Sequence, residues 1–395
     1  MSIDTSKLID GLNSAGMPKK GYEVTQEGDV GTIETPYLAE ADVDFDQILR
    51  KCGFSPDAYE IAGDPKVKRW EAQTPDGIEW LSSYGISVRK RASDLLPEAD
   101  IQALAERLRS YTPPPAAQSV EGRPTVTAVV NLADAQASKS EGGGVDGLTQ
   151  RLIDGLDNVQ AWLDRCRTHY NVDELILVNN GDPIEGCSGN YASQLFTVQL
   201  NHRQQYNYVL DFWDMYARTL FPQFNKGQFV TVLSNHGELG RFGTRKNQTD
   251  DSDSADAFLA ETLKRIYDST PGLDRIKWSI PRDEMNVFVE TAQGVNLAFN
   301  HGHTVNGSDA TAFEKWLGGQ VRGDERAFRA DIWVTAHRHN FQAWDLGSCS
   351  VFQCPSLDGG SKWFRDMTGK YSNSGILAFL AGDHTKTKWS DLAFL

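Results

Sequence analysis

Two histidine pairs in the second half of the chain have the residue type and spacing of metal ligands. His301 and His303 form one pair, and His337 and His339 form the other, so these stretches hold four of the eight histidines in 395 residues. Neutral imidazole is the commonest protein ligand for a transition metal. Packing does not explain such clustering, and the pairs therefore indicate a metal site if the chain also supplies carboxylates.

Three polar clusters upstream supply carboxylates and further donors. They are, in chain order, Asp134 with Gln136, Asp182, and Asn235 with His236. A single aspartate after a strand is more often a helix cap or a turn residue than a ligand. A structural role alone does not account for ligand types in five successive clusters. The pattern therefore favours a di-metal centre.

Each cluster follows an apolar run that is typical of a buried strand. The expected strands are 126–132, 174–179, 228–234, 295–299 and 332–335. A side chain just past the carboxyl end of a core strand lies at the mouth of a sheet, where α/β proteins usually place their chemistry. The strand ends are thus the elements that must position the ligands.

The rest of this region alternates helices with strands and then becomes rich in strands. Helices are expected at 148–170, 194–220 and 253–267, and further strands at 276–280, 285–291, 341–345, 350–354 and 376–380. This order predicts two packed sheets covered by helices. Three consecutive prolines within 112–124 favour a semi-rigid linker, so 125–395 is expected to be the catalytic domain.

Residues 1–111 are expected to form a small α+β module. The segment 45–52 reads as a helix, a turn follows, and a second helix is expected from Asp57. Strand-like runs at 67–73 and 80–88 complete the outline of a winged-helix or helix-turn-helix DNA-binding unit. The alternative is a small α+β module with an ordinary solvated basic edge.

Composition limits the class of protein. An apolar fraction of 39% and an aromatic fraction of 10% suit a globular chain, and no apolar run has the length of a membrane helix. The five cysteines form no Cys-x-x-Cys pair, and the N-terminus lacks a secretory pattern. We therefore expect a cytoplasmic protein without a membrane partner. The net charge of −15 argues against a generally basic nucleic-acid-binding surface.

The order of the five clusters is similar to that of the calcineurin-like metallophosphoesterases. The motifs that carry the resemblance are Gly181-Asp182, Ser234-Asn235-His236 and Ala336-His337-x-His339, and the match covers 125–395. The resemblance implies an α/β fold, a four-layer αββα sandwich, and hydrolysis of a phosphoester. Two cations held by a bridging carboxylate can clamp a phosphate and acidify a water between them.

The resemblance also implies roles for individual residues. It places one ion on Asp134, Gln136, Asp182 and His339, and the other on Asp182, Asn235, His301 and His337. Asp182 would bridge the two ions. His236 would protonate the departing oxygen or stabilise the transition state.

Other polar residues near these motifs have two readings. His303 either reaches the substrate phosphate or is a polar loop residue, and Arg241 either contacts phosphate or is solvated. Glu185 and Glu238 either orient histidines or lie exposed in loops.

Gln136 departs from the histidine that most of the resembled family has at this position. Its neutral amide oxygen should weaken ion binding at this position and favours harder ions, Mn²⁺ or Mg²⁺ over Zn²⁺. The expected cofactors are two divalent ions, with Mn²⁺ as the first choice and Mg²⁺, Fe²⁺ or Zn²⁺ as alternatives.

A looser resemblance links the chain to phage-encoded metallophosphoesterases that are compared with SbcD-type repair nucleases. It makes a Mn²⁺-dependent DNA nuclease the first choice, with DNA as the substrate and the host cytoplasm as the location. The alternatives are a phosphatase or cyclic phosphodiesterase, and a DNA-binding protein with a degenerate metal site. The sequence leaves a homodimer and a partner ATPase open.

Gln136→His tests the ligand assignment. The substitution replaces an amide oxygen with an imidazole, which should tighten the first metal position. A metal titration of both proteins measures the change, and unchanged affinity at both positions would contradict the assignment of Gln136 as a ligand.

Overall fold

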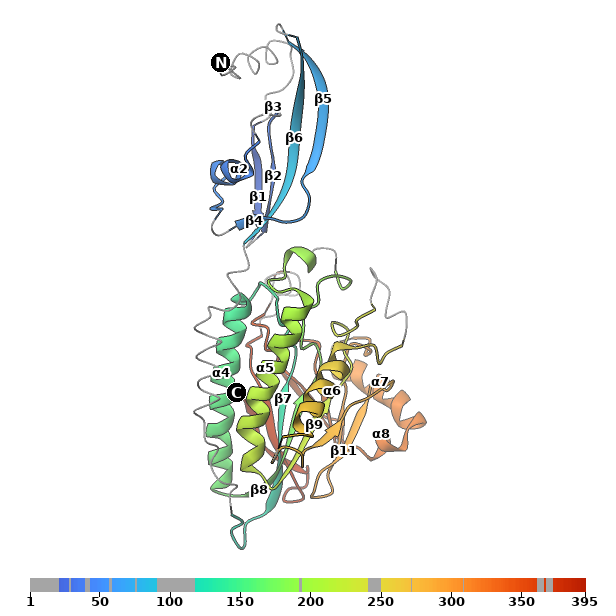
Figure 1. Cartoon of the computed structure of the whole chain (residues 1–395). Helices are drawn as coiled ribbons and strands as arrows, with labels where there is room; N and C mark the ends of the chain where they lie inside the picture. Colours follow the sequence, from blue (N-terminus) through green and yellow to red (C-terminus); the bar gives the residue numbers. More distant parts are fainter. Residues whose placement is uncertain are drawn as a thin grey trace. The chain divides into compact units, whose positions relative to one another are not determined.

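The chain divides into two compact units, 1–98 and 99–395, in a computed structural model. The structure describes residues 21–27, 30–39, 43–56, 59–74, 77–90, 118–191, 194–240, 250–270, 272–307, 309–360, 366 and 372–395. Figure 1 shows the order of the elements along the chain. The three consecutive prolines of the expected linker lie outside the described residues, which resume at 118.

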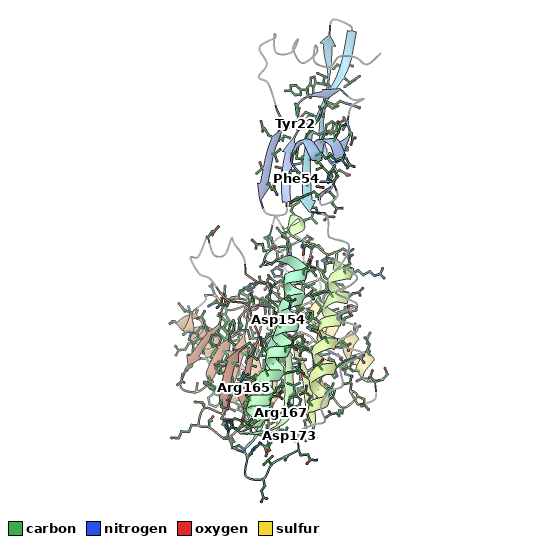
Figure 2. All side chains as sticks on the ribbon, turned by 90° about the vertical axis from the view of Figure 1, so that its left-hand side faces the viewer. Tyr22, Phe54, Asp154, Arg165, Arg167 and Asp173 are labelled. Atoms are coloured by element: carbon green, nitrogen blue, oxygen red, sulfur yellow. The ribbon has the colours of Figure 1, made fainter. Side chains whose placement is uncertain are left out.

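The first unit is an antiparallel sheet with one helix among its described residues. The strands are β1 (Glu23–Glu27), β2 (Val30–Glu34), β3 (Leu38–Ala39), β4 (Tyr59–Ile61), β5 (Lys66–Thr74) and β6 (Gly77–Lys90), and the helix is α2 (Phe45–Lys51). The long strand β6 pairs with β2, β3, β4 and β5. Buried Ile33, Ile48, Phe54 and Ile86 form its core, against which Tyr22 packs (Figure 2).

The expected helix at 45–52 is present, but the second helix from Asp57 is wrong. The side chain of Asp44 caps α2 by accepting a hydrogen bond from the amide of Gln47. Tyr59–Ile61 instead forms β4, which pairs antiparallel with β6. Tyr59 and Ile61 both pack on the core of the sheet, as alternate residues of a strand do. The winged-helix outline is therefore not confirmed, whereas the two expected strands appear as β5 and β6.

The second unit contains a six-stranded sheet in the order β10-β9-β8-β7-β16-β17. Its strands are β7 (Thr125–Leu132), β8 (Asn171–Asn179), β9 (Lys226–Thr231), β10 (Lys277–Ser279), β16 (Leu377–Ala381) and β17 (Trp389–Phe394). Strands β7 to β10 are parallel, and β16 and β17 are antiparallel additions at one side.

Three long helices cover this sheet. They are α4 (Gly144–Arg167), α5 (His202–Leu220) and α6 (Ala255–Tyr267), with short 3₁₀ turns at η2 (Gln194–Phe196) and η3 (Phe221–Gln223). Figure 1 shows the helices running beside β7, β8 and β9. Asp154 and Arg165 lie on the exposed side of α4, and Asp173 lies near the start of β8 (Figure 2).

The other sheet has five strands in the order β11-β12-β13-β15-β14. These are β11 (Val287–Glu290), β12 (Asn296–Phe299), β13 (Ile332–Thr335), β14 (Gln342–Asp345) and β15 (Ser350–Gln353). Strands β12, β13 and β15 are parallel to one another. Two helices, α7 (Ala310–Gly323) and α8 (Glu325–Arg329), belong to this half of the unit.

Alternation along the strands builds the layers. Leu297 and Phe299 join the core that the two sheets share, whereas Ala298 between them joins the cluster that contains Phe313 of α7. The two sheets therefore pack face to face with helices on their outer sides. This mixed α/β arrangement agrees with the expected packed sheets.

Some elements differ from the sequence-based expectation. Helix α5 begins at His202 rather than near Gln194, because Asn201 and Gln204 form a capping box that fixes the start of the helix. Helices α7 and α8 and strand β17 were not expected. Among the described residues, the structure contains no helix with the length and apolar character needed to cross a bilayer.

Phe352→Ala tests the core between the sheets. Phe352 is 1% exposed and its ring centroid lies 5.2 Å from that of Phe379 and 5.1 Å from that of Trp389. We expect the truncation to lower the free energy of unfolding by about 3–5 kcal/mol, because it leaves a cavity. Phe328→Ala is the control, since Phe328 is 75% exposed. Urea denaturation followed by tryptophan fluorescence measures both, and equal stabilities would contradict the assigned core.

Candidate metal centre

The polar clusters of the sequence meet where strands of both sheets end. Asp134, Asp182 and Asn235 follow β7, β8 and β9 of one sheet, and His301 and His337 follow β12 and β13 of the other. Contacts described below join them across the two sheets. Ends of parallel strands in two packed sheets thus form one site.

The backbone at this site is unusual. Eight non-glycine residues in the described part of the chain have positive φ, and five of them are Asp134 (49°), Gln136 (42°), Asp182 (50°), His337 (68°) and His339 (55°). Non-glycine residues in the left-handed region cost on the order of 1–3 kcal/mol each and cluster at functional sites. The surrounding fold must therefore stabilise these conformations.

Both ring nitrogens of His301 have close polar neighbours. Its Nδ1 lies 2.8 Å from the backbone oxygen of Asn180, which only accepts, so Nδ1 carries a proton. In a neutral ring Nε2 is then an acceptor, yet it faces Oδ2 of Asp182 at 3.0 Å and Oδ1 of Asn235 at 3.2 Å. Three acceptor atoms in a buried site repel one another. A proton or a cation is needed to make this arrangement favourable.

The pKa values reflect the same excess of negative charge. Burial alone would lower the pKa of His301, but the Asp182 and Asp134 carboxylates outweigh it and raise the pKa to about 9. A divalent ion would displace this proton, since a metal ligand must be deprotonated. Burial, together with His301, lowers the pKa of His337 to about 2, so this ring is neutral and has a lone pair available.

Asp182, His301 and His337 form a compact donor group. One ligand atom from each lies within 4.8 Å of the others. The rings of His301 and His337 have centroids 5.1 Å apart. The group combines a carboxylate with two imidazoles, which suits a transition-metal ion.

A second carboxylate and imidazole repeat the pattern. Oδ1 of Asp134 lies 3.2 Å from Nε2 of His339, and Nδ1 of His339 lies 3.1 Å from Oδ2 of Asp358. Burial would lower the pKa of His339, but Asp358 and Asp134 raise it to about 10. A carboxylate on the far nitrogen orients an imidazole for metal binding and raises its basicity.

The two aspartates are held in the same manner. Oδ1 of Asp182 accepts the amide of His236 at 2.8 Å, and Oδ2 of Asp134 accepts the amide of His337 at 3.1 Å. Their other oxygens are buried, and Oδ2 of Asp182 lies 3.0 Å from Nε2 of His301 while Oδ1 of Asp134 lies 3.2 Å from Nε2 of His339. Because each of these oxygens faces a histidine Nε2, the residues fit divalent cations.

The backbone amide of His236 is bound by Asp182, and its ring is bound by Glu185. Its Nδ1 lies 2.7 Å from the backbone oxygen of Glu185, so this nitrogen donates and leaves Nε2 as an acceptor. Nε2 lies 3.4 Å from the amide nitrogen of Gln136. The side chain of Glu185 is buried, and the hydroxyl of Tyr191 donates to it at 2.5 Å. Burial raises the pKa of Glu185 although His236 opposes the shift.

Gln136 reaches the site, but its oxygen has a partner. Oε1 accepts a hydrogen bond from Nζ of Lys139 at 3.0 Å. Lys139 also forms an ion pair with Asp358. Neither Lys139 nor Asp358 was identified from the sequence as a site residue. Asp358 follows the end of β15, so the strand-end rule that found the other residues also applies to it.

His303 and Arg241 are the two residues expected to contact the substrate. The ring centroid of His303 lies 5.4 Å from that of His301 and 6.2 Å from that of His337, so His303 belongs to the histidine cluster. Arg241 lies in 241–249, outside the described residues.

Comparisons with known proteins find distant structural similarity. No family model matches it, and no curated protein matches its sequence. An archaeal phosphodiesterase has 12% identity and a TM-score of 0.30, with 68% of this chain and 99% of that chain covered. A predicted phosphoesterase of Streptococcus pneumoniae has 10% identity and a TM-score of 0.27, with 68% and 86% covered. Vps29 of Entamoeba histolytica, complexed with zinc, has 11% identity and a TM-score of 0.26, with 65% and 94% covered. These similarities are distant, so a function has to rest on the site itself.

Gly181→Ala tests how the site holds His301. An added Cβ would lie 2.5 Å from Nδ1 of His301 and 2.7 Å from Cβ of Ser234, at a residue with φ +95°. We expect the affinity for Mn²⁺ to fall at least about 10-fold, as when a partner of a metal ligand is lost.

Gly294→Ala provides the matched control, because Gly294 has φ +76° but nothing within 4 Å of an added Cβ. Gly294→Ala should lower the free energy of unfolding through backbone strain, and it should leave the Mn²⁺ affinity unchanged. Calorimetric titration of both variants with MnCl₂ measures the difference, and equal effects would contradict the contact with His301.

Proposed function

We propose that the chain is a metal-dependent phosphoester hydrolase. The observation that carries the proposal is the cluster of acceptor atoms around Nε2 of His301, where Asp182 and Asn235 each direct an oxygen at it. Buried acceptors are arranged in this way at cation sites. The motif order, which resembles that of calcineurin-like metallophosphoesterases, supports the same conclusion.

The ligands divide into two sets around Asp182. Asp182, Asn235, His301 and His337 would hold one ion, and Asp134 and His339, with Asp182 and Gln136, would hold the other. Bound divalent ions would polarise the phosphate and lower the pKa of a water. The residues of the chain orient these donors, because Asn180 and Asp358 accept from the far nitrogens of His301 and His339.

His236 is the proton donor in this proposal. Its Nδ1 donates to the carbonyl of Glu185, which directs Nε2 away from the protein backbone and toward the site. In the imidazolium form Nε2 also carries a proton, which it would transfer to the departing oxygen or donate to it in a hydrogen bond. Its amide nitrogen is fixed by Asp182, so the acid and the metal ligand move together.

The preferred substrate class is DNA, with Mn²⁺ as the preferred ion. The looser resemblance to SbcD-type nucleases supports this choice. Two observations favour a second candidate, a phosphodiesterase or phosphatase for small nucleotides. The helix-turn-helix outline of the first unit is not confirmed, and the net charge of −15 opposes binding of long nucleic acids.

Asp182→Asn tests the hydrolase. The substitution removes the carboxylate that both ion positions share while keeping the side-chain shape. With an aryl phosphodiester and Mn²⁺, we expect kcat/KM to fall by at least about 100-fold. Loss of a residue that only orients a metal ligand costs up to about 100-fold, and loss of the ligand itself should cost no less. EDTA should abolish wild-type hydrolysis, and MnCl₂ should restore it.

Asp154→Asn is the matched control, because Asp154 lies on the exposed side of α4 (Figure 2). It should hydrolyse the substrate at the wild-type rate. Wild-type rates in Asp182→Asn, or activity that survives EDTA, would overturn the proposal.

The substrate class needs a separate assay. Labelled linear DNA, labelled circular DNA and cyclic nucleotides are each incubated with the full chain and Mn²⁺. Cleavage of DNA supports the nuclease. Turnover of nucleotides without cleavage of either DNA would overturn the nuclease and support the second candidate.

A further inference from the structure

A buried lysine lies beside the Asp134 half of the metal centre. The side chain of Lys139 is 12% exposed and forms an ion pair with the fully buried side chain of Asp358. Its Nζ also donates to Oε1 of Gln136 at 3.0 Å. A cationic group therefore lies next to an oxygen that the family resemblance assigns to a divalent ion.

The contact with Lys139 fixes the orientation of the Gln136 amide. An ammonium group can only donate, so it requires the oxygen of Gln136 on its side. The amide nitrogen then faces Nε2 of His236 at 3.4 Å. An amide oxygen has two lone pairs, and Lys139 uses one of them. An ion bound through the other would have an ammonium as its close neighbour.

Lys139 also shares the charge of Asp358. Oδ2 of Asp358 accepts from Nδ1 of His339 at 3.1 Å and pairs with Lys139 at the same atom. Part of the negative charge that would strengthen His339 as a ligand is thereby neutralised. Among the described residues, no lysine or arginine forms an ion pair with Asp182, which faces His301. Arg338 adjoins His337 in the chain, but its guanidinium donates to the backbone oxygen of Val305.

We propose that Lys139 makes the two metal positions unequal, so that one divalent ion binds tightly at Asp182, His301 and His337 and a second binds weakly at Asp134 and His339. The inference rests on the proposed metal-dependent function and adds the residue that sets the stoichiometry. Like charges in a site that excludes water repel strongly, which is the physical cause. Lys139 is a positioning residue, because it acts through Gln136 and Asp358.

The test measures metal binding without substrate. The full chain is treated with EDTA, desalted and titrated with MnCl₂ by calorimetry, and bound manganese is counted after gel filtration. The wild type should retain one ion, and its second should bind at least about 10-fold more weakly. Lys139→Met should tighten the second ion at least about 10-fold and leave the first unchanged.

Two variants control for charge and for fold. Lys139→Arg keeps the positive charge and should preserve the unequal binding. Lys226→Met removes a lysine that is 57% exposed and pairs with Asp173 at 3.5 Å, and it should bind as the wild type does. Thermal unfolding of each variant shows whether it is folded.

Specific results would overturn the inference. If the wild type binds two Mn²⁺ ions with equal affinity, the inference is wrong, even if Lys139→Met does not fold. The inference is also wrong if Lys139→Met folds and binds Mn²⁺ as the wild type does. Unequal binding without hydrolysis of any phosphoester would support the inference and overturn the proposed function alone, whereas absence of any bound ion would overturn both.

Discussion

The candidate metal centre of the second unit is governed by one electrostatic constraint. Its buried acceptor atoms face one another and repel, so the surrounding structure must hold them in place. Nε2 of His301 and the oxygens of Asp182 and Asn235 cannot lie 3.0 to 3.2 Å apart without positive charge between them. A protonated imidazole meets this need in the metal-free chain. A divalent ion meets it better, because it satisfies all the donors together and is not limited to a single hydrogen bond.

The core between the two packed sheets supplies the folding stability that this arrangement of acceptors requires. This core buries Phe299, Phe352 and Phe379, and such burial is the dominant favourable contribution to folding. This stability offsets the left-handed backbone at Asp134 and Asp182 and the desolvation of their carboxylates. Asp134, Asp182 and His301 each follow closely on the end of a strand, which leaves little freedom for their side chains. The acceptors therefore remain directed at one another instead of turning to solvent.

The sequence predicted the parts of this arrangement that follow from local pattern. Apolar runs located the strands, and polar residues after the strand ends located most of the donors. It did not identify Lys139, because a lysine in a loop looks solvated and its partner Asp358 is distant in sequence. It also misassigned Tyr59–Ile61, since a short run with two inward-facing residues fits a helix or a strand until its pairing with β6 is known.

The origin of the ligands has a mechanical consequence. Asp182 follows β8 of the six-stranded sheet in the second unit, and His301 and His337 follow β12 and β13 of the five-stranded sheet. An ion bound among them would therefore be a cross-link between the two layers. The core between the layers is apolar, and apolar contacts have no preferred direction. Ion binding then adds RT ln(1 + [L]/Kd) to the free energy of unfolding. The resistance of this unit to heat and to proteases would accordingly rise and fall with the supply of free metal.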